Sequence, residues 1–295
     1  MKQRRQKLLY LDQLNQEIEN QCGLAVEEDL KGSPLFDISA SLIAPSTDAK
    51  ATIISRENAI VCGQQWVERI FKQLDKQITL FWHKKDGEVV NAEQVICEIS
   101  GNARAMLTAE RSAMNFLQTL SATATTTNVY VKAMANDHCQ LLDTRKTIPG
   151  MRFGQKYAVL CGGGKNHRLT LTDRFLIKEN HIVACGGIAS ALHKAKAMGL
   201  SQLIEIEVES IKELEQAIDG KPDIIMLDNF TNDQLLEAVR LKQKHSHNAI
   251  LEASGNVNLK TIAKIAETGV DCISVGAITK NIAAIDLSMR IKLVR

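Results

Sequence analysis

The stretch between residues 143 and 181 concentrates basic side chains within loop-forming sequence. Pro149 and Gly150 follow the first group of them, and three consecutive glycines, 162–164, precede another. Loops with proline and glycine at fixed points hold side chains in defined places, and arginine there favours bidentate contact with carboxylate or phosphate. The pattern favours a site for a multiply charged anion over a solvated basic face. The basic residues are Arg145, Lys146, Arg152, Lys156, Lys165, His167, Arg168, Arg174 and Lys178.

The glycine run resembles a phosphate-binding loop only in part. That motif requires Ser or Thr after its Lys, whereas Asn166 follows Lys165. The run instead predicts a tight backbone turn that delivers His167 and Arg168.

Carboxylates follow two apolar segments. Glu205 and Glu207 alternate with apolar residues, so both point to one face of a predicted strand. Only Glu207, nearer the carboxyl end, can reach a site at that end, which leaves Glu205 a structural role. Glu207 and Asp228 are suited to neutralise a bound cation or a carbocation-like transition state. The alternative for Asp228 is a carboxylate at the start of a helix, near Thr231.

Small residues follow two further predicted strands. Ser254-Gly255-Asn256 lies after the apolar segment 249–253, and Gly276-Ala277 follows Val275. Small residues at helix N-termini leave backbone N–H groups free to receive a phosphate. These loops are therefore candidates for a phosphate site.

Arg111 stands out on the predicted helix 107–120. It follows Leu107 by four residues and precedes Met114 by three, which predicts that it lies on the apolar stripe. A charge there needs a partner. That partner is either adjacent, such as Glu110 or solvent, or it lies in another subunit whose site Arg111 enters.

The elements that must position these residues alternate between strand and helix in the C-terminal half. This alternation predicts a parallel sheet covered on both faces, which fits a doubly wound sheet or a β/α barrel. Candidate residues at so many successive strand ends favour the barrel, where those ends converge on one mouth. The predicted strands are 202–208, 223–227, 249–253 and 273–275, with helices at 211–218, 231–241 and 259–267, and the strand-end residues are Lys178, Glu207, Asp228, Ser254 and Gly276.

The first hundred residues predict a smaller α+β domain, joined to the second part by the helix 107–120. An amphipathic helix at the N-terminus precedes short strand-like segments separated by glycine or charged turns. These segments are 51–55, 59–62, 78–82 and 94–100.

Composition excludes several classes of protein. The chain has 295 residues, 45% of them hydrophobic, and a formal net charge of +2, so neither nucleic acid nor an anionic membrane is an expected partner. We find no export signal and no apolar run of about 18 residues that would span a membrane. The seven cysteines show no C-x-x-C spacing, which favours free thiols in a reducing cytoplasm over a zinc site or disulfides.

Taken in order along the chain, these motifs closely resemble those of the quinolinate phosphoribosyltransferase family (nicotinate-nucleotide pyrophosphorylase, carboxylating). The resemblance extends from about residue 28 to the end and is specific only when the motifs are combined. The matching segments are Glu110-Arg111, 115–118, 143–150, 162–168, 177–181, 226–229 and 252–255.

The resemblance implies transfer of a phosphoribosyl group from phosphoribosyl pyrophosphate to quinolinate with decarboxylation, in the biosynthesis of NAD. It implies an α/β fold with an N-terminal α/β sandwich domain, residues 1–113 joined by 281–295, and an incomplete, seven-stranded β/α barrel, residues 114–280. It also implies magnesium as cofactor and a cytoplasmic homodimer.

The resemblance also implies roles for particular residues. Thr144, Arg145, Lys146, His167, Arg168 and Lys178 would hold the dicarboxylate and the phosphates, with Arg111 entering from the neighbouring subunit. Glu207 and Asp228 would bind the ribose or the magnesium–pyrophosphate region, directly or through water, and with Lys146 and Lys178 they are the expected catalytic residues. The ribose phosphate would lie against Ser254, Gly255, Asn256, Val275, Gly276 and Ala277.

Two segments depart from the family pattern. Phe36-Asp37-Ile38-Ser39 stands where members usually carry Gly-Asp-(Ile/Leu)-Thr, and Ala122 replaces a usual glycine. Neither segment contains an expected ligand.

Three other functions compete with this reading. A molybdenum-transport-associated paralogue of the same fold is disfavoured by the intact basic set from Arg145 to Lys178. A nicotinate-type enzyme acting on a monocarboxylate fits less well, because the acid pocket has two Arg and two Lys. A phosphate-binding sensor would not need Glu207 and Asp228 opposite the cations. The paired acids of the common phosphoribosyltransferase class are absent from the sequence.

Overall fold

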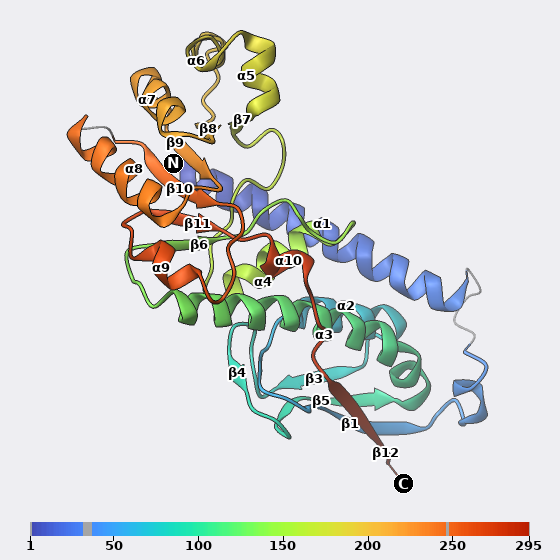
Figure 1. Ribbon diagram of the computed structural model, residues 1–295. Helices are drawn as coiled ribbons and strands as arrows, with labels where there is room; N and C mark the ends of the chain where they lie inside the picture. The colour runs from blue at the N-terminus through green and yellow to red at the C-terminus, as the bar shows by residue number, and fades with distance from the viewer. Residues whose placement is uncertain (1, 32–36, 246–247, 295) are drawn as a thin grey trace. The chain divides into compact units, whose positions relative to one another are not determined.

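The computed structural model describes residues 2–31, 37–245 and 248–294, and the chain divides into two units (Figure 1). Unit 1 comprises residues 1–128, 148–163 and 281–295, and unit 2 comprises residues 129–147 and 164–280. The boundary expected between residues 113 and 114 falls inside helix α3 (Ala103–Met134). In the segment 36–39, which departs from the family pattern, Phe36 lies outside the described residues. The side chain of Asp37 accepts a hydrogen bond from the backbone N–H of Ala40 at 2.9 Å.

Unit 1 is built on an antiparallel sheet of strand order β12-β1-β5-β3. Alternate residues of β1 (Ala49, Ala51 and Ile53) are buried, the period of two expected for a sheet with one covered face. The C-terminal strand β12 pairs with β1, which brings the end of the chain back to unit 1. The other elements of this unit are α1 (Lys2–Leu30), η1 (Ala40–Leu42), β1 (Asp48–Ser55), β2 (Ala59–Ile60), α2 (Gln64–Leu74), β3 (Thr79–Trp82), β4 (Val89–Val90), β5 (Val95–Asn102), α4 (Arg152–Cys161) and β12 (Leu287–Leu293).

The core of unit 1 gathers around Trp66 on α2. Its ring lies 6.5 Å from that of Phe116 on α3 and 6.0 Å from that of Tyr157 on α4, measured between centroids. Neither α2 nor α4 was predicted from the sequence. Both helices supply aromatic residues to one hydrophobic cluster. This packing stabilises short helices that their own sequence patterns predict only weakly.

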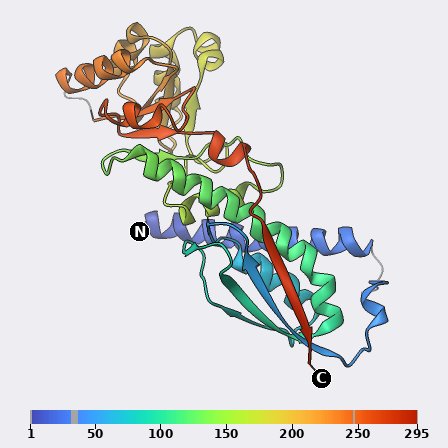
Figure 2. The same cartoon turned by 60° about the horizontal axis from the view of Figure 1, so that its bottom comes forward.

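Unit 2 is built on a parallel sheet of strand order β6-β11-β10-β9-β8-β7, with α5 to α9 packed one beside the next along it (Figures 1 and 2). All described strand pairs of this sheet are parallel. Its elements are β6 (Gln140–Leu142), β7 (Phe175–Ile177), α5 (Glu179–Cys185), α6 (Ile188–Ala197), β8 (Ile204–Val208), α7 (Ile211–Gly220), β9 (Ile224–Asp228), α8 (Asn232–Lys244), β10 (Ile250–Ser254), α9 (Ile262–Ala266), β11 (Cys272–Ser274) and α10 (Ala277–Lys280).

The strand and helix alternation predicted for the C-terminal half is confirmed. Thr231 begins α8 as expected: its hydroxyl accepts from the N–H of Gln234, whose side chain in turn accepts from the N–H of Thr231. One element was predicted too long, because α9 begins at Ile262 rather than Leu259. There, Asn258 and Thr261 bond to each other, and the side-chain oxygen of Asn258 accepts the backbone N–H of Lys260. These bonds close turns in place of the first helical residues.

The parallel sheet has six strands among the described residues, and one isolated parallel bridge, between Leu142 and Lys165, extends it beyond β6. In the part of the chain that is described, no helix is both long and apolar enough to cross a membrane. All seven cysteines are free thiols.

Gly162, at the end of α4, is required by packing. A β-carbon at this position would overlap the carbonyl oxygen of Ala124 and lie 2.6 Å from the β-carbon of Thr127. We expect Gly162→Ala to lower the free energy of unfolding by about 1–3 kcal/mol, the usual cost of overpacking. Urea denaturation followed by circular dichroism measures this change.

Gly23→Ala is the matched control, because a β-carbon at Gly23 meets no atom within 4 Å. Since Gly23 lies within α1, we expect this variant to be unchanged or stabilised by up to about 1 kcal/mol. Equal stability of the two variants would contradict the packing at Gly162.

Candidate active site

A cavity of about 560 Å³ opens at the carboxyl ends of the strands of unit 2. This is the end at which ligands bind in parallel α/β sheets. All of its lining belongs to unit 2. The predicted site residues that line it are Thr144, Arg145, Lys146, His167, Arg168, Lys178, Glu207, Asp228, Ser254, Gly255 and Asn256.

The basic stretch identified in the sequence is divided by the fold. Arg145, Lys146 and Arg168 face the cavity, whereas Arg152 and Lys156 belong to α4 in unit 1. The first group is therefore gathered at one cavity of unit 2. Burial, and then the positive charge of Arg145, lower the pKa of Arg168. Because guanidinium remains charged in proteins, two like charges share this wall of the cavity.

The turn after the glycine run delivers His167 and Arg168 to the cavity, as predicted. Asp143, which is buried, accepts the backbone N–H of His167 at 2.9 Å and the side-chain amide of Asn166 at 2.6 Å. One carboxylate thus fixes the loop on both sides of the peptide that precedes the histidine. The ring of His167 is 5% exposed, so little freedom remains to it.

Lys178 and Glu207 form an ion pair at the cavity wall. The Nζ of Lys178 lies 2.9 Å from Oε2 of Glu207. Burial by itself lowers the pKa of Lys178, but the hydrogen bond and charge of Glu207, aided by nearby carboxylates, outweigh burial and raise this pKa. The lysine is therefore fully charged at neutral pH and already paired with a carboxylate.

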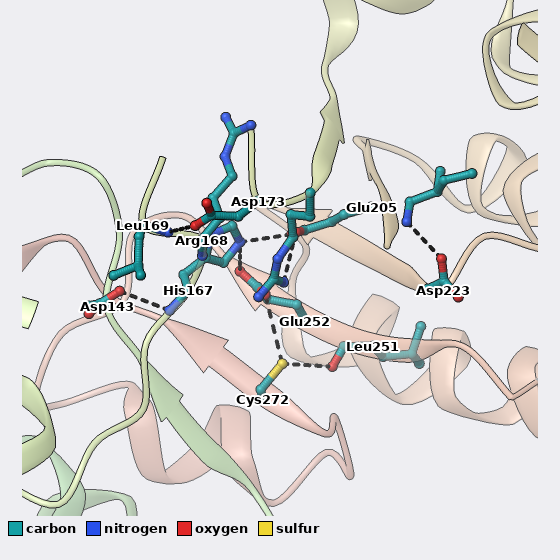
Figure 3. Close-up of polar contacts among 12 residues, drawn as sticks. Asp143, His167, Arg168, Leu169, Asp173, Glu205, Asp223, Leu251, Glu252 and Cys272 are labelled. Carbon is teal, nitrogen blue, oxygen red and sulfur yellow. Dashed lines mark hydrogen bonds and ion pairs between the residues drawn. The ribbon is translucent and has the colours of Figure 1, made fainter. Parts of the chain in front are cut away.

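Glu205 lies on the same strand but below the cavity, in the structural role predicted for it. It is fully buried, and its two oxygens bind different partners: Oε1 lies 3.0 Å from Nε2 of His167, and Oε2 lies 3.2 Å from Nη1 of Arg174. Figure 3 shows His167 pointing toward Glu205 and Glu252. The contacts from below the cavity therefore hold the imidazole of His167 in place.

Glu252 is a second buried carboxylate of this cluster, and the sequence analysis missed it. Its Oε1 lies 3.6 Å from Nε2 of His167, and its Oε2 lies 3.9 Å from Sγ of Cys272. Burial, followed by the charge of Glu205, raises the pKa of Glu252 to about 7, while His167, Ser274 and Arg174 act in the opposite direction.

His167, Glu205 and Glu252 have the residue types of a metal site, with ligand atoms within 4.8 Å of one another. Arg174 already supplies a positive charge to Glu205, and the imidazole nitrogen lies at hydrogen-bond distance from the same carboxylate. The geometry is that of a hydrogen-bonded network rather than of a cation cage.

Asp228 and the loop after β10 also line the cavity. Asp228 accepts a hydrogen bond from the side chain of Asn229 at 2.7 Å, and Asn256 donates to the Asn229 side-chain oxygen at 3.0 Å. Gly255 adopts a φ of +90°, and a β-carbon there would overlap Asn229. The two loops therefore approach each other closely only because residue 255 is glycine.

The proposed phosphate loops do not stand at helix N-termini in the way the sequence analysis assumed. After Ser254–Asn256, five residues precede α9, which begins at Ile262. Gly276 and Ala277 do adjoin a helix, but α10 has only 4 residues. Val275 is buried, and a β-carbon at Gly276 would lie 3.0 Å from Cδ of Lys146, so this loop supports the lysine.

Arg111 was predicted to lie on the apolar stripe of its helix, and that prediction is wrong. The buried stripe of α3 passes through Met106, Ala109, Ala113 and Leu117, whereas Arg111 is exposed. Leu107 is itself only half-buried, so the spacing from Leu107 to Met114 marked the edge of the stripe. Arg111 belongs to unit 1 and is not among the residues that line the cavity.

Four further residues line the cavity and were not identified as site residues: Asn229, Ser274, Leu176 and Met226. Asn229 adopts a φ of +57°, which asparagine tolerates better than most residues, and it directly follows Asp228. An Asp-Asn pair after an apolar strand was the available signal. The other three lie on strands, where only the register decides which residues face inward.

The cavity combines the cations Arg145, Lys146, Arg168 and Lys178 with the carboxylates of Glu207 and Asp228. This combination suits a polyanion that carries a cation or develops positive charge. Arginines and lysines can bind carboxylates and phosphates through charge-assisted hydrogen bonds. Glu207 and Asp228 offer oxygen ligands to a hard cation or negative charge to an electron-poor carbon.

Comparison with known proteins agrees with this chemistry. Residues 37–121 match the family model for the N-terminal domain of quinolinate phosphoribosyl transferase, and residues 123–290 match the model for its C-terminal domain. A probable carboxylating nicotinate-nucleotide pyrophosphorylase of Bacillus subtilis is 37% identical, over 87% of this chain and 88% of its own.

Solved structures extend the similarity to the fold. The nicotinate-nucleotide pyrophosphorylase of Francisella tularensis is 47% identical, with a TM-score of 0.88, over 94% of this chain and 97% of its own. NadC of Streptococcus pyogenes is 34% identical, with a TM-score of 0.89, over the same shares of the two chains. With both domain models matched in order and the motifs around the cavity in place, the chain belongs to the quinolinate phosphoribosyltransferase family.

Proposed function

We propose that this chain transfers the phosphoribosyl group of phosphoribosyl pyrophosphate to quinolinate and that decarboxylation gives nicotinate mononucleotide, carbon dioxide and pyrophosphate. The observation that carries this proposal is a single cavity in which Arg145, Lys146, Arg168 and Lys178 converge with Glu207 and Asp228. Both substrates are polyanions, and the reaction passes through electron-poor carbon. The cations bind the polyanionic substrates, and the carboxylates stabilise the electron-poor carbon.

The acceptor binds where the arginines lie. Arg145 and Arg168 present planar guanidinium groups, which match the two oxygens of a carboxylate. His167 underlies Arg168, while Lys146 and Lys178 supply point charges to the remaining carboxylate and phosphate oxygens. A dicarboxylate satisfies more of these donors than a monocarboxylate does, which favours quinolinate over nicotinate.

The bond changes need no covalent nucleophile. The bond from C1′ of the ribose to pyrophosphate breaks with its electron pair going to the pyrophosphate, and the ring nitrogen of quinolinate supplies the pair for the new bond to C1′. Glu207 and Asp228 stabilise the positive charge that develops on the ribose, as carboxylates do in glycoside hydrolysis by analogy. The resulting pyridinium withdraws the electron pair left at C2 when carbon dioxide departs, and a proton then adds to C2.

Magnesium is the expected cofactor, and the donor set fits it. Glu207 and Asp228 are the carboxylates of the cavity, and carboxylate oxygens with water are the usual ligands of this ion. Bound with pyrophosphate, the ion would neutralise charge on the leaving group. The proposed ribose-phosphate ligands are Ser254, Gly255, Asn256, Val275, Gly276 and Ala277.

We further propose that the parallel sheet is an incomplete seven-stranded β/α barrel and that unit 1 is an α/β sandwich domain. The bridge between Leu142 and Lys165 supports a seventh, very short strand beyond β6. The proposed enzyme is a cytoplasmic homodimer, in keeping with its free cysteines. Arg111, exposed on α3, is proposed to enter the partner's cavity.

The first prediction concerns the substrate. Purified protein incubated with magnesium, phosphoribosyl pyrophosphate and quinolinate should release carbon dioxide and form nicotinate mononucleotide, both measurable by mass spectrometry. Nicotinate in place of quinolinate should give no product. Turnover of nicotinate, with no reaction of quinolinate, would contradict the proposed function.

The second prediction concerns Arg145. Arg145→Ala should lower kcat/KM for quinolinate by about 10- to 100-fold, because a charge-assisted hydrogen bond in a buried pocket contributes about 1.5–3 kcal/mol. Lys165→Ala is the control, since Lys165 is exposed on the same basic stretch but does not line the cavity. An equal loss in both variants would show that general basicity matters rather than the cavity.

The third prediction concerns the shared site. Arg111→Ala and Arg145→Ala proteins should each be weakly active as pure homodimers. Mixed under subunit exchange, they should regain up to about a quarter of the wild-type activity, because one site of each mixed dimer then contains both arginines. Activity that stays at the level of the separate variants would show that Arg111 does not act across an interface.

A further inference from the structure

Beneath the cavity, the fold assembles a network of four ionisable side chains, three of them buried, that the proposed chemistry does not use directly. His167 comes from the loop after the glycine run, Glu205 lies on β8 and Glu252 lies on β10 (Figure 3). Arg174 directly precedes β7. Both carboxylates are 0% exposed. Burying two carboxylates is costly, so their retention requires partners.

The hydrogen bonds of His167 define its tautomer. Its Nδ1 accepts the backbone N–H of Arg168 at 2.8 Å, so this nitrogen carries no proton. The ring proton is then on Nε2, which lies 3.0 Å from Oε1 of Glu205 and donates to it. An imidazolium would place a second N–H against the N–H of Arg168. The histidine is therefore a neutral element among the cations of the cavity.

Through these bonds the network reaches Arg168. Glu205 fixes the imidazole, and the imidazole holds the backbone N–H of the residue whose guanidinium lines the cavity. The side chain of Arg168 extends away from Glu205 and Glu252 (Figure 3). The two carboxylates thus orient a cation that they do not contact.

The charges of the network do not cancel when both carboxylates are ionised. Arg174 lies 3.2 Å from Glu205 and balances it, whereas Glu252 faces the imidazole at 3.6 Å and the thiol of Cys272 at 3.9 Å. The remaining group near Glu252 is Ser274 on β11. Arg174 is already engaged by Glu205, and the charges around Glu252 do not outweigh the effect of its burial, which raises its pKa.

We propose that Glu205 and Glu252 are positioning residues of the reaction: they lock His167 in its Nε2–H tautomer, through it they place Arg168, and a single proton on Glu252 sets the charge beneath the anion-binding cavity. With that proton present, the network is neutral overall. Without it, a negative charge lies under the bound dicarboxylate and weakens its binding. This inference rests on the proposed placement of quinolinate over Arg168.

Steady-state kinetics across pH tests the role of the proton. The pKa of Glu252 is raised to about 7, and the carboxylates of quinolinate are already ionised there. At saturating phosphoribosyl pyrophosphate, the KM for quinolinate of the wild type should rise about three- to tenfold between about pH 6 and pH 8. Glu252→Gln, which mimics the protonated acid, should keep a low KM that varies less than about twofold, with kcat within about threefold of the wild type.

Glu267→Gln is the matched control, because it removes one exposed glutamate of the same unit and should retain the wild-type profile. A Glu252→Gln protein whose KM follows the wild-type pH profile would overturn the proposal, as would a wild-type KM that does not change with pH. Absence of any turnover of quinolinate by the wild type would instead contradict the proposed function, so the two failures are distinguishable.

Nitrogen-15 NMR of histidine-labelled wild-type protein tests the tautomer without any change in the network. His167, assigned by the loss of its signal in His167→Asn, should show a protonated Nε2 and an unprotonated Nδ1 at neutral pH. A doubly protonated ring, or a proton on Nδ1, would refute the arrangement. This measurement needs no substrate, so it is independent of the proposed function.

The pH dependence of stability gives a third readout. The folded pKa of Glu252 lies above the ordinary glutamate value of 4.5, so its protonated form favours the folded state. That contribution is complete below about pH 4.5 and is lost as the pH rises through about 7. Relative to Glu252→Gln, the wild type should therefore lose thermal stability between about pH 5 and pH 8. A difference that stays constant over this range would show that Glu252 is not protonated in the folded protein at the lower pH.

Discussion

Cationic side chains that converge on one cavity repel one another, and the candidate site depends on the carboxylates that offset this repulsion. Burial, and after it the charge of Arg145, lower the pKa of Arg168. Lys178 is balanced by Glu207 at 2.9 Å, and Arg174 is balanced by Glu205 at 3.2 Å. Because these pairs are formed before any ligand arrives, the donors are already oriented and little reorganisation accompanies binding.

The parallel sheet places the carboxylates at two depths. Glu207 stands at the level of Met226 of β9, while Glu205 lies one inward-facing position deeper on β8. The upper acid can reach a substrate, and the deeper one can reach only His167 and Arg174. Successive inward-facing residues are about 7 Å apart along a strand. Glu207 is therefore placed for catalysis, while Glu205 is placed to support the residues below the cavity.

Much of this arrangement could be predicted from the sequence, because strand alternation and the residues at strand ends are local signals. The division of roles between Glu205 and Glu207 followed from their order along one strand. The burial of Glu252 did not, because an isolated glutamate in an apolar segment does not reveal which face it occupies. Arg111 was misplaced since a residue at the edge of a helical stripe has nearly the same spacing as one at its centre. Side-chain hydrogen bonds at Asn258 competed with helix formation, so α9 begins later than predicted. The loop Ser254–Asn256 therefore does not adjoin a helix N-terminus.

A crystal structure of the chain with quinolinate bound would test the central claim most directly, namely that the cavity of unit 2 recognises a dicarboxylate through cations held by buried acids. The account predicts one ligand carboxylate within about 3 Å of the guanidinium groups of Arg145 and Arg168, with His167 still bonded to Glu205 beneath them. Quinolinate bound outside this cavity, or a His167 ring turned from Glu205 toward the ligand, would contradict it.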